Sequence, residues 1–215
     1  RQRRLVLCRQ AQTDRTRILG GPIVHVALIV AAHLGLCCGP INRFCTHAQK
    51  QTYLTPLAQG QHIGCLGLTE PGAGSDLQGG VRTFAERVGD QWVINGSKMW
   101  LTNGGEATTA VLLVRTDRRG GSHSLSHIIV PTRTPGFQPG KPEEKMGLHG
   151  CHTYAVEIDN VRVPAENLLG DEGRGLHQTL EVLDGGRIGI AALSVGLAQA
   201  AFDAALAYAK SRNAF

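Results

Sequence analysis

The residues with the clearest chemical potential in this chain form one glycine-rich turn, Gly67-Leu-Thr-Glu-Pro-Gly-Ala-Gly-Ser-Asp76. Gly72 and Gly74 leave the backbone bare, so its amide groups and the hydroxyls of Thr69 and Ser75 can donate hydrogen bonds to an anion such as a pyrophosphate. The turn lacks the third glycine of a dinucleotide-binding fingerprint and the lysine of a Walker motif. From the residues alone, a tight turn without a ligand remains an equal alternative.

A second stretch places an aromatic ring beside a hydroxyl. In Trp92-Val-Ile-Asn-Gly-Ser-Lys-Met-Trp-Leu-Thr-Asn-Gly-Gly105, Trp100 and Thr102 are two residues apart. On a regular strand their side chains share a face. An indole can cover a flat apolar ring, and a nearby hydroxyl can stabilise charge that gathers on that ring. The alternative for Trp100 is a core aromatic residue.

Four further residues could suggest a metal site. Cys37, Cys38, Cys45 and His47 are close in sequence, but they lack the paired C-x-x-C spacing of closed zinc sites. We therefore favour small buried residues and expect no metal. The six cysteines form no disulfide framework, which indicates a reducing compartment. We expect the cytoplasm of a bacterium, with the mitochondrial matrix as the alternative.

Composition limits the class of protein that must position these residues. The chain has 215 residues, 42% hydrophobic and 18% charged, which is typical of a globular protein and too apolar for disorder. Its formal charge of +5 is partly due to arginines near the start, and no basic stripe with aromatics is visible, so we expect no nucleic-acid binding. The apolar stretch from Pro22 to Cys38 is interrupted by His25 and His33, which predicts a buried helix and no membrane span.

Hydrophobic periodicity divides the chain into three regions. Helical spacing covers Val24–Cys38 and Thr46–Ala58, and it returns from Asp171 through Tyr208. Between them about six to eight strands are expected, and the pair Asn95-Gly96 predicts a hairpin turn. The expected strands are Gly64–Leu68, Phe84–Val88, Trp92–Ile94, Lys98–Thr102, Val111–Thr116, His127–Pro131 and Tyr154–Val163.

These regions predict an α+β fold with a central all-β barrel or sandwich flanked by incomplete helical domains. We expect residues 1–60 to be the remnant of an N-terminal helical domain, 61–168 to be the β domain and 169–215 to begin a C-terminal helical domain. Because the chain starts with Arg1 instead of Met, we expect an internal piece of a longer protein.

The glycine-rich turn Gly67–Asp76 and the segment Trp92–Gly105 resemble consecutive signatures of the acyl-CoA dehydrogenase family. Similarity extends from about His33 to Phe215, and it includes Met146-Gly-Leu-His-Gly150, Gly170-Asp-Glu-Gly-Arg-Gly175, Leu183-Asp-Gly-Gly-Arg187 and Tyr208-Ala-Lys-Ser-Arg-Asn-Ala-Phe215. The resemblance implies an acyl-CoA dehydrogenase-like fold and FAD as cofactor.

The resemblance also implies roles for individual residues. Leu68 and Thr69 would lie beside the pyrimidine edge of the flavin, Trp100 would cover one face of the ring, and Thr102 would bond near N5. Arg212 would reach the FAD pyrophosphate of a neighbouring subunit, which implies a homo-oligomer, expected to be a tetramer. The full set implied to bind cofactor is Leu66, Gly67, Leu68, Thr69, Glu70, Pro71, Gly72, Ala73, Gly74, Ser75, Trp100, Leu101, Thr102 and Arg212.

For the substrate, the resemblance implies contacts to the CoA portion from Ser75, Asp184, Gly185, Gly186 and Arg187. The alternative for Arg187 is a salt bridge along its own helix. The implied reaction is oxidation of a saturated acyl-CoA to its trans-2-enoyl form in fatty acid β-oxidation, with electrons leaving through an electron-transferring flavoprotein.

The catalytic base of the family is normally a glutamate beyond this chain's last residue. The position used by a minority branch holds Gly186, so no catalytic residue is assigned and the piece alone is expected to be inactive. The alternatives are an acyl-CoA oxidase or monooxygenase on the same scaffold, or a non-catalytic flavin-binding or oligomerisation module.

Overall fold

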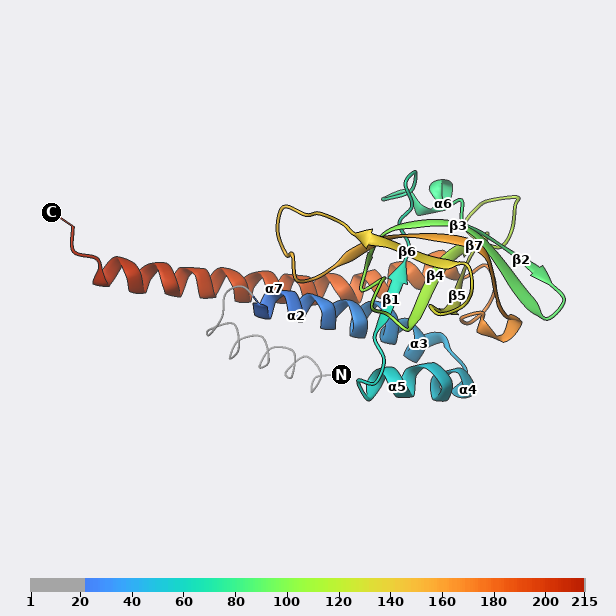
Figure 1. Cartoon of the computed structure of the whole chain (residues 1–215), viewed down its shortest axis with the longest axis horizontal. Coiled ribbons are helices and arrows are strands. Elements are labelled where there is room, and N and C mark those ends of the chain that lie inside the picture. The colour runs from blue at the N-terminus through green and yellow to red at the C-terminus, as the bar shows by residue number, and fades with distance from the viewer. Residues whose placement is uncertain (1–21, 215) are drawn as a thin grey trace.

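The computed structural model describes residues 22–214, so predictions for residues 1–21 and for Phe215 lie outside the described residues. A helical segment precedes a curled sheet, and a long helix follows it (Figure 1). The first helices are α2 (Pro22–Ala31), the π-helix η1 (Ala32–Cys38), α3 (Gly39–Phe44), α4 (His47–Gln49), the π-helix η2 (Lys50–Leu54) and α5 (Thr55–Ala58).

The helical segment predicted for Thr46–Ala58 is confirmed. A capping box begins it, since the Gln49 amide N–H donates to Thr46 Oγ1 at 3.3 Å and Gln49 Oε1 accepts from the Thr46 N–H at 2.8 Å. Leu57 is buried against the sheet, and Tyr53 packs against the same apolar cluster.

The prediction of a buried helix over Pro22–Cys38 was wrong for its first half. Only one face of α2 packs on the protein, and Val26 and Val30 on the other face are exposed. Val24–Phe44 and Gly175–Ser211 are long and apolar enough to cross a membrane by length and composition alone, a test that core helices of soluble proteins also pass. The predicted lack of a membrane span therefore stays a prediction.

Seven strands form one sheet in the order β1-β4-β2-β3-β7-β6, with β5 paired to β4. β1 runs parallel to β4, while the β2–β3, β3–β7, β6–β7 and β4–β5 pairs are antiparallel. The strands are β1 (Gly64–Gly67), β2 (Phe84–Val88), β3 (Gln91–Thr102), β4 (Thr109–Arg115), β5 (Leu125–Pro131), β6 (Phe137–Pro142) and β7 (Thr153–Pro164). The α+β fold class is confirmed.

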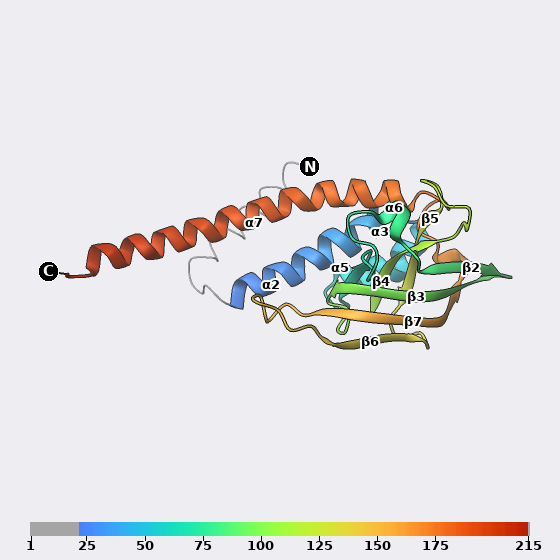
Figure 2. The same cartoon turned by 90° about the horizontal axis from the view of Figure 1, so that it is seen from above.

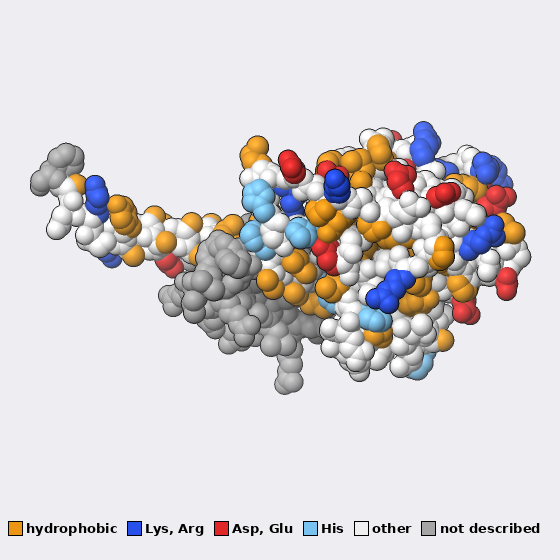
Figure 3. All heavy atoms as spheres, viewed as in Figure 1, with side chains coloured by type: hydrophobic (Ala, Val, Ile, Leu, Met, Phe, Trp, Pro, Cys, Tyr) orange, Lys and Arg blue, Asp and Glu red, His pale blue; other side chains and the backbone are white. Residues whose placement is uncertain are grey.

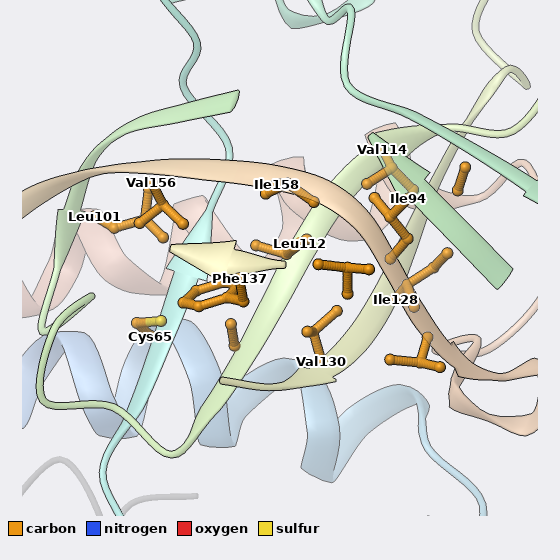
Figure 4. Close-up of a cluster of buried hydrophobic side chains, with 14 of the residues drawn as sticks. Cys65, Ile94, Leu101, Leu112, Val114, Ile128, Val130, Phe137, Val156 and Ile158 are labelled. Carbon is orange, nitrogen blue, oxygen red and sulfur yellow. The ribbon is translucent and has the colours of Figure 1, made fainter. Parts of the chain in front are cut away.

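The sheet curls around the main hydrophobic core. In Figure 4, Leu112 of β4, Val130 of β5, Phe137 of β6 and Val156 of β7 gather in this interior. Every residue of β4 is buried, because the opposite face of that strand meets the helices, where Val111 packs with residues of η1, α3 and α5. A strand covered on both faces needs a continuous apolar run, and β4 supplies one.

Two sequence predictions about the strands were wrong. Asn95-Gly96 forms no hairpin turn, because β3 continues through it and the pairing with β7 shifts register between Ile94 and Gly96. The Asn95 side chain accepts the Asn160 N–H at 2.7 Å, which stabilises this irregularity. The second error is β6, which was not predicted because its glycine and two prolines are poor strand formers.

The long helix α7 (Gly175–Ser211) starts on β5 and then leaves the body. Its first turns are fixed by a buried histidine: His127 Nδ1 lies 3.1 Å from Gln178 Oε1, and Nε2 lies 3.2 Å from Thr179 Oγ1. Beyond this anchor the helix runs beside α2 and projects past it (Figure 2). Hydrophobic side chains are visible along the projecting part (Figure 3). Val195 and Phe202 are among the exposed residues of this helix.

His127 predicts an acid-sensitive anchor for α7. Burial lowers the pKa of His127 from 6.5 to about 4, so the unfolded chain binds a proton more readily between these two pH values. The contribution of the neutral, buried His127 to the free energy of unfolding is fully present above pH 6.5. About 3 kcal/mol of it is expected to be lost as the pH falls to 4. Denaturant unfolding of the full-length protein at several pH values measures this. The free energy of unfolding should depend less on pH in His127→Gln than in wild type. In His123→Gln, at an exposed site, its pH dependence should match wild type. The same pH dependence in wild type and both variants contradicts the prediction.

Candidate functional site

A shallow pocket of about 150 Å³ opens where the end of β1, the irregular part of β3 and the helices meet. β1 and the residues after it supply one wall, β3 supplies a second, and η1 and α7 supply the third. The lining residues are Ala32, Leu36, Leu66, Leu68, Thr69, Met99, Trp100, Thr102 and Leu183, none of which is acidic.

Trp100 is the unusual member of this lining. Its φ of +60° lies in the left-handed region, where a bulky side chain is a genuine outlier. The pairing of β3 with β7 shifts register between Lys98 and Leu101, so the regular alternation of side chains is broken. The indole is 53% exposed instead of entering the core. Such strain is typical of functional sites, and the exposed aromatic ring lines the pocket, where it can contact a ligand.

The glycine-rich turn adjoins Trp100 directly. The Met99 N–H donates to the Thr69 carbonyl at 2.8 Å, which joins β3 to the start of the turn. Glu70 and Ala73 then exchange backbone hydrogen bonds of 2.9 and 3.0 Å. Beyond them Gly72 and Gly74 face open space, since a Cβ on either would meet nothing within 4 Å. The backbone there can be approached closely, as an anion-binding turn requires.

Glu70 faces inward and forms a buried ion pair. Its Oε1 lies 2.7 Å from Lys98 Nζ, and its carboxylate also accepts the N–H groups of Arg82 and Thr83. Burial alone would raise the pKa of Glu70, but Lys98 and the N–H donors outweigh burial and lower it. Burial lowers the pKa of Lys98 to about 8 against the opposite effect of Glu70. Lys98 was not predicted as part of the site, because a lysine at the start of a predicted strand, after Gly96 and Ser97, is usually exposed.

The structure thus brings together the two stretches that the sequence singled out. Five residues implied to bind the flavin line the pocket: Leu66, Leu68, Thr69, Trp100 and Thr102. Gly67, Glu70, Ala73 and Leu101 are buried beside it, while Pro71, Gly72, Gly74 and Ser75 are exposed along the turn. The role of each remains a prediction. Thr102 and Trp100 share the pocket despite the broken alternation of the strand.

Four of the five residues implied to contact the substrate, Asp184 to Arg187, directly follow Leu183 on α7, and the fifth, Ser75, is exposed on the glycine-rich turn. A Cβ on Gly186 would lie 3.8 Å from Leu36, another lining residue, so this turn borders the pocket. Asp184 and Arg187 are exposed and form a salt bridge of 2.6 Å. The ion pair along the helix therefore exists, and it leaves the other guanidinium donors of Arg187 facing solvent.

Arg212 lies far from this pocket in the same protomer. It caps the C-terminal end of α7, 29 residues after Leu183, which corresponds to about 40 Å along a helix. A contact between Arg212 and a ligand in this pocket would therefore have to come from another subunit.

A second pocket, of about 240 Å³, lies on the far side of the loop after β3. Its lining includes Glu106 and Arg133, and the Glu106 carboxylate accepts hydrogen bonds from Tyr154 Oη at 2.7 Å and His152 Nδ1 at 2.8 Å. These groups satisfy one another and no aromatic ring faces this space, so we favour the pocket beside Trp100 as the ligand site.

The cysteines within residues 22–214 show no metal-site geometry. Cys37, Cys38 and Cys45 are buried in the apolar cluster between helices and sheet, whereas His47 is exposed. Across residues 22–214 no three metal-ligating side chains are grouped.

Three family models match consecutive segments of the chain: the acyl-CoA dehydrogenase N-terminal domain at residues 19–61, the middle domain at 65–161 and the C-terminal domain at 173–215. A probable acyl-CoA dehydrogenase of Bacillus subtilis is 51% identical over 189 residues, which are 87% of this chain and 50% of the relative. The chain therefore spans about half the length of the curated relatives it matches.

Solved structures of similar fold also include acyl-CoA dehydrogenases. The butyryl-CoA dehydrogenase of Megasphaera elsdenii is 44% identical, with a TM-score of 0.87 over 89% of this chain and 50% of that one. A glutaryl-CoA dehydrogenase of Mycobacterium smegmatis in complex with FADH2 is 38% identical, with a TM-score of 0.81 over 87% of this chain and 47% of that one.

Proposed function

The chain belongs to the acyl-CoA dehydrogenase family, and we propose that the whole protein is an FAD-dependent oxidoreductase that converts a short-chain acyl-CoA thioester into its trans-2-enoyl form. The observation that carries the proposal is the convergence of Leu68, Thr69, Trp100 and Thr102 on one pocket. The butyryl-CoA specificity of the Megasphaera relative supports a short acyl chain.

The pocket fits the isoalloxazine part of FAD. A flat apolar ring needs an exposed aromatic cover, which Trp100 provides, and apolar contacts, which Leu66 and Leu68 provide. A pyrophosphate needs bare N–H groups, and the open backbone at Gly72 and Gly74 supplies them. When bound, the flavin would supply the two-electron acceptor for oxidation of the acyl chain.

The chain's own residues would bind the flavin ring, orient it and shield it from solvent. Thr69 and Thr102 carry hydroxyls that can hold polar edges of the ring, while Leu36 and Leu183 cover the pocket from the helical side. A bound ring that excludes water here would strengthen the electrostatic interactions inside the site. None of the lining residues can remove a proton as a carboxylate, so we assign no catalytic base to residues 22–214.

A homo-oligomer and an external electron acceptor are also parts of the proposal. Arg212 is a cation at the tip of a projecting helix, where a pyrophosphate of a neighbouring subunit would suit it. The acceptor in this proposal is an electron-transferring flavoprotein, in line with the solved electron transferring flavoprotein of Acidaminococcus fermentans, one chain of which is 46% identical to this chain.

Spectroscopy of the full-length protein tests the proposal. The purified protein should be yellow or should bind added FAD in a saturable way. Addition of a short-chain acyl-CoA without oxygen should bleach the flavin absorbance and yield the trans-2-enoyl product. Turnover with a dye acceptor but not with oxygen distinguishes a dehydrogenase from an oxidase. A protein that binds no FAD contradicts the proposal.

Arg187 gives a prediction that separates a substrate contact from a helix salt bridge. Its ion pair with Asp184 is exposed, so Arg187→Ala should change stability by no more than about 0.5 kcal/mol. If the guanidinium also holds the CoA portion, KM for acyl-CoA should rise about tenfold or more with little change in kcat. Arg174→Ala, at an exposed arginine that precedes α7, is the control. An unchanged KM in Arg187→Ala assigns the residue to the helix alone.

A further inference from the structure

The buried pair Lys98–Glu70 stands at the junction of both pocket walls. The side chain of Lys98 is fully buried and that of Glu70 is 5% exposed, and Lys98 Nζ lies 2.7 Å from Glu70 Oε1. The same ammonium donates to the Leu68 carbonyl at 3.2 Å. Leu68 precedes the turn and lines the pocket, so Lys98 holds this wall by two contacts from β3.

Glu70 extends the network to the segment that leaves the turn. Its Oε2 accepts the Arg82 N–H at 2.6 Å, and its Oε1 accepts the Thr83 N–H at 3.0 Å. The Thr83 hydroxyl in turn donates to the Ser97 carbonyl at 3.0 Å, next to Lys98. The start of the glycine-rich turn and the segment after the short helix α6 (Leu77–Gly80) are thus fixed to one point on β3.

That point lies immediately before the irregular part of the strand. Met99 donates its N–H to Thr69, and Trp100 takes its left-handed conformation one residue later. The regular pairing with β7 is lost between Lys98 and Leu101, so the strand ladder does not fix Trp100 there. Lys98 is the last residue before the indole that keeps its pairing with β7, and its side chain is buried.

A gain in stability does not explain this arrangement. The desolvation of two buried charges largely cancels their attraction, so an apolar pair of similar volume is often as stable. What a buried, fully hydrogen-bonded ion pair provides is a defined geometry, because each charge must keep its partners.

We propose that the Lys98–Glu70 pair is a positioning device that fixes the turn after Leu68 relative to Trp100, so that both pocket walls meet the same flavin ring. The inference rests on the proposed flavin function. Neither side chain touches the ligand, and both act through the backbone of Leu68, Thr69 and Met99.

Two variants of the full-length protein test it. Lys98→Met keeps the length and apolar stem of the side chain but leaves the Glu70 carboxylate without its cation. Lys98→Met/Glu70→Gln removes both charges, so its unfolding temperature should recover relative to the single variant. In both proteins the Kd for FAD should rise roughly tenfold or more, as for supporting residues of other cofactor sites.

The reduction potential and the absorbance spectrum of the flavin, measured at saturating FAD, provide the second readout. Both should differ from wild type in the double variant, because Trp100 and Leu68 would no longer be held at the same separation. Val163→Ala is the matched control: Val163 is buried at the opposite end of β7, so it should lower the unfolding temperature and change the Kd for FAD less than about twofold.

Each outcome decides between the alternatives. A wild-type protein that binds no FAD contradicts the proposed function itself. Wild-type FAD affinity, spectrum and potential in the double variant contradict only the positioning role. Failure of both variants to fold also overturns it, because the pair would then be a requirement for folding.

Discussion

Replacing Gly96 by alanine is expected to destabilise the protein by roughly 3–5 kcal/mol, which combines backbone strain with a steric clash. Gly96 has a φ of +142°, a conformation that L residues rarely adopt. A Cβ there would lie 2.6 Å from both the Cα and the Oγ1 of Thr83. Because Thr83 also donates an N–H to Glu70, the clash would reach the support of the glycine-rich turn. Denaturant unfolding of the full-length protein measures the loss.

Gly89→Ala is the matched control for this prediction. Gly89 lies in the turn between β2 and β3 with a φ of +61°, but a Cβ there would meet nothing within 4 Å. Its substitution should therefore cost only the left-handed strain, about 1–2 kcal/mol. If both variants lose the same stability, the close approach of Gly96 to Thr83 has no energetic consequence and the prediction is wrong.

Trp100→Ala is expected to weaken FAD binding about tenfold to hundredfold. Stacking of an aromatic side chain on a heterocyclic ring contributes about 1–3 kcal/mol by alanine substitution, and 1.4 kcal/mol corresponds to a factor of ten. Because the indole is 53% exposed without the ligand, its removal should change the stability of the ligand-free protein little. Titration with FAD followed by absorbance measures the Kd, and thermal unfolding of the apoprotein provides the stability.

The second tryptophan serves as the control. Trp92 is 2% exposed, and its Nε1–H donates to the Ala165 carbonyl at 3.2 Å. Trp92→Phe should therefore lower stability through the lost hydrogen bond and leave the Kd for FAD unchanged. If Trp100→Ala leaves the Kd for FAD unchanged, the exposed indole does not cover the flavin.

Several of these sites depend on features that local sequence signals misassigned. The pair Asn95-Gly96 is the strongest short hairpin signal known, yet here it forms a bulge inside a twelve-residue strand. The partner strand decided the outcome, since β7 pairs with β3 on both sides of the bulge and Asn160 bonds to the Asn95 side chain. Differences in β-propensity span only about 1 kcal/mol, so the weak strand propensity of Asn95 and Gly96 does not end β3 against such a ladder and its buried face.

The positions of the helices show a similar division. Periodicity predicted the helical segments over 24–38, 46–58 and 171–208, because a helix places apolar residues three or four positions apart, within a short stretch of sequence. It could not tell that α2 buries only one face. Burial depends on which surfaces meet, and those contacts are between segments far apart in the chain.

The sequence by itself determined the order helices, β sheet, helix, the family resemblance, and the two stretches that meet at the pocket. These rest on residue types, spacing and turn chemistry, which are local properties. Only the tertiary structure decided that Glu70 turns inward to Lys98, that Trp100 turns outward in a strained conformation, and that Leu36 and Leu183 close the pocket. Those arrangements are set by burial and pairing between distant residues, whose energies no single stretch of sequence contains.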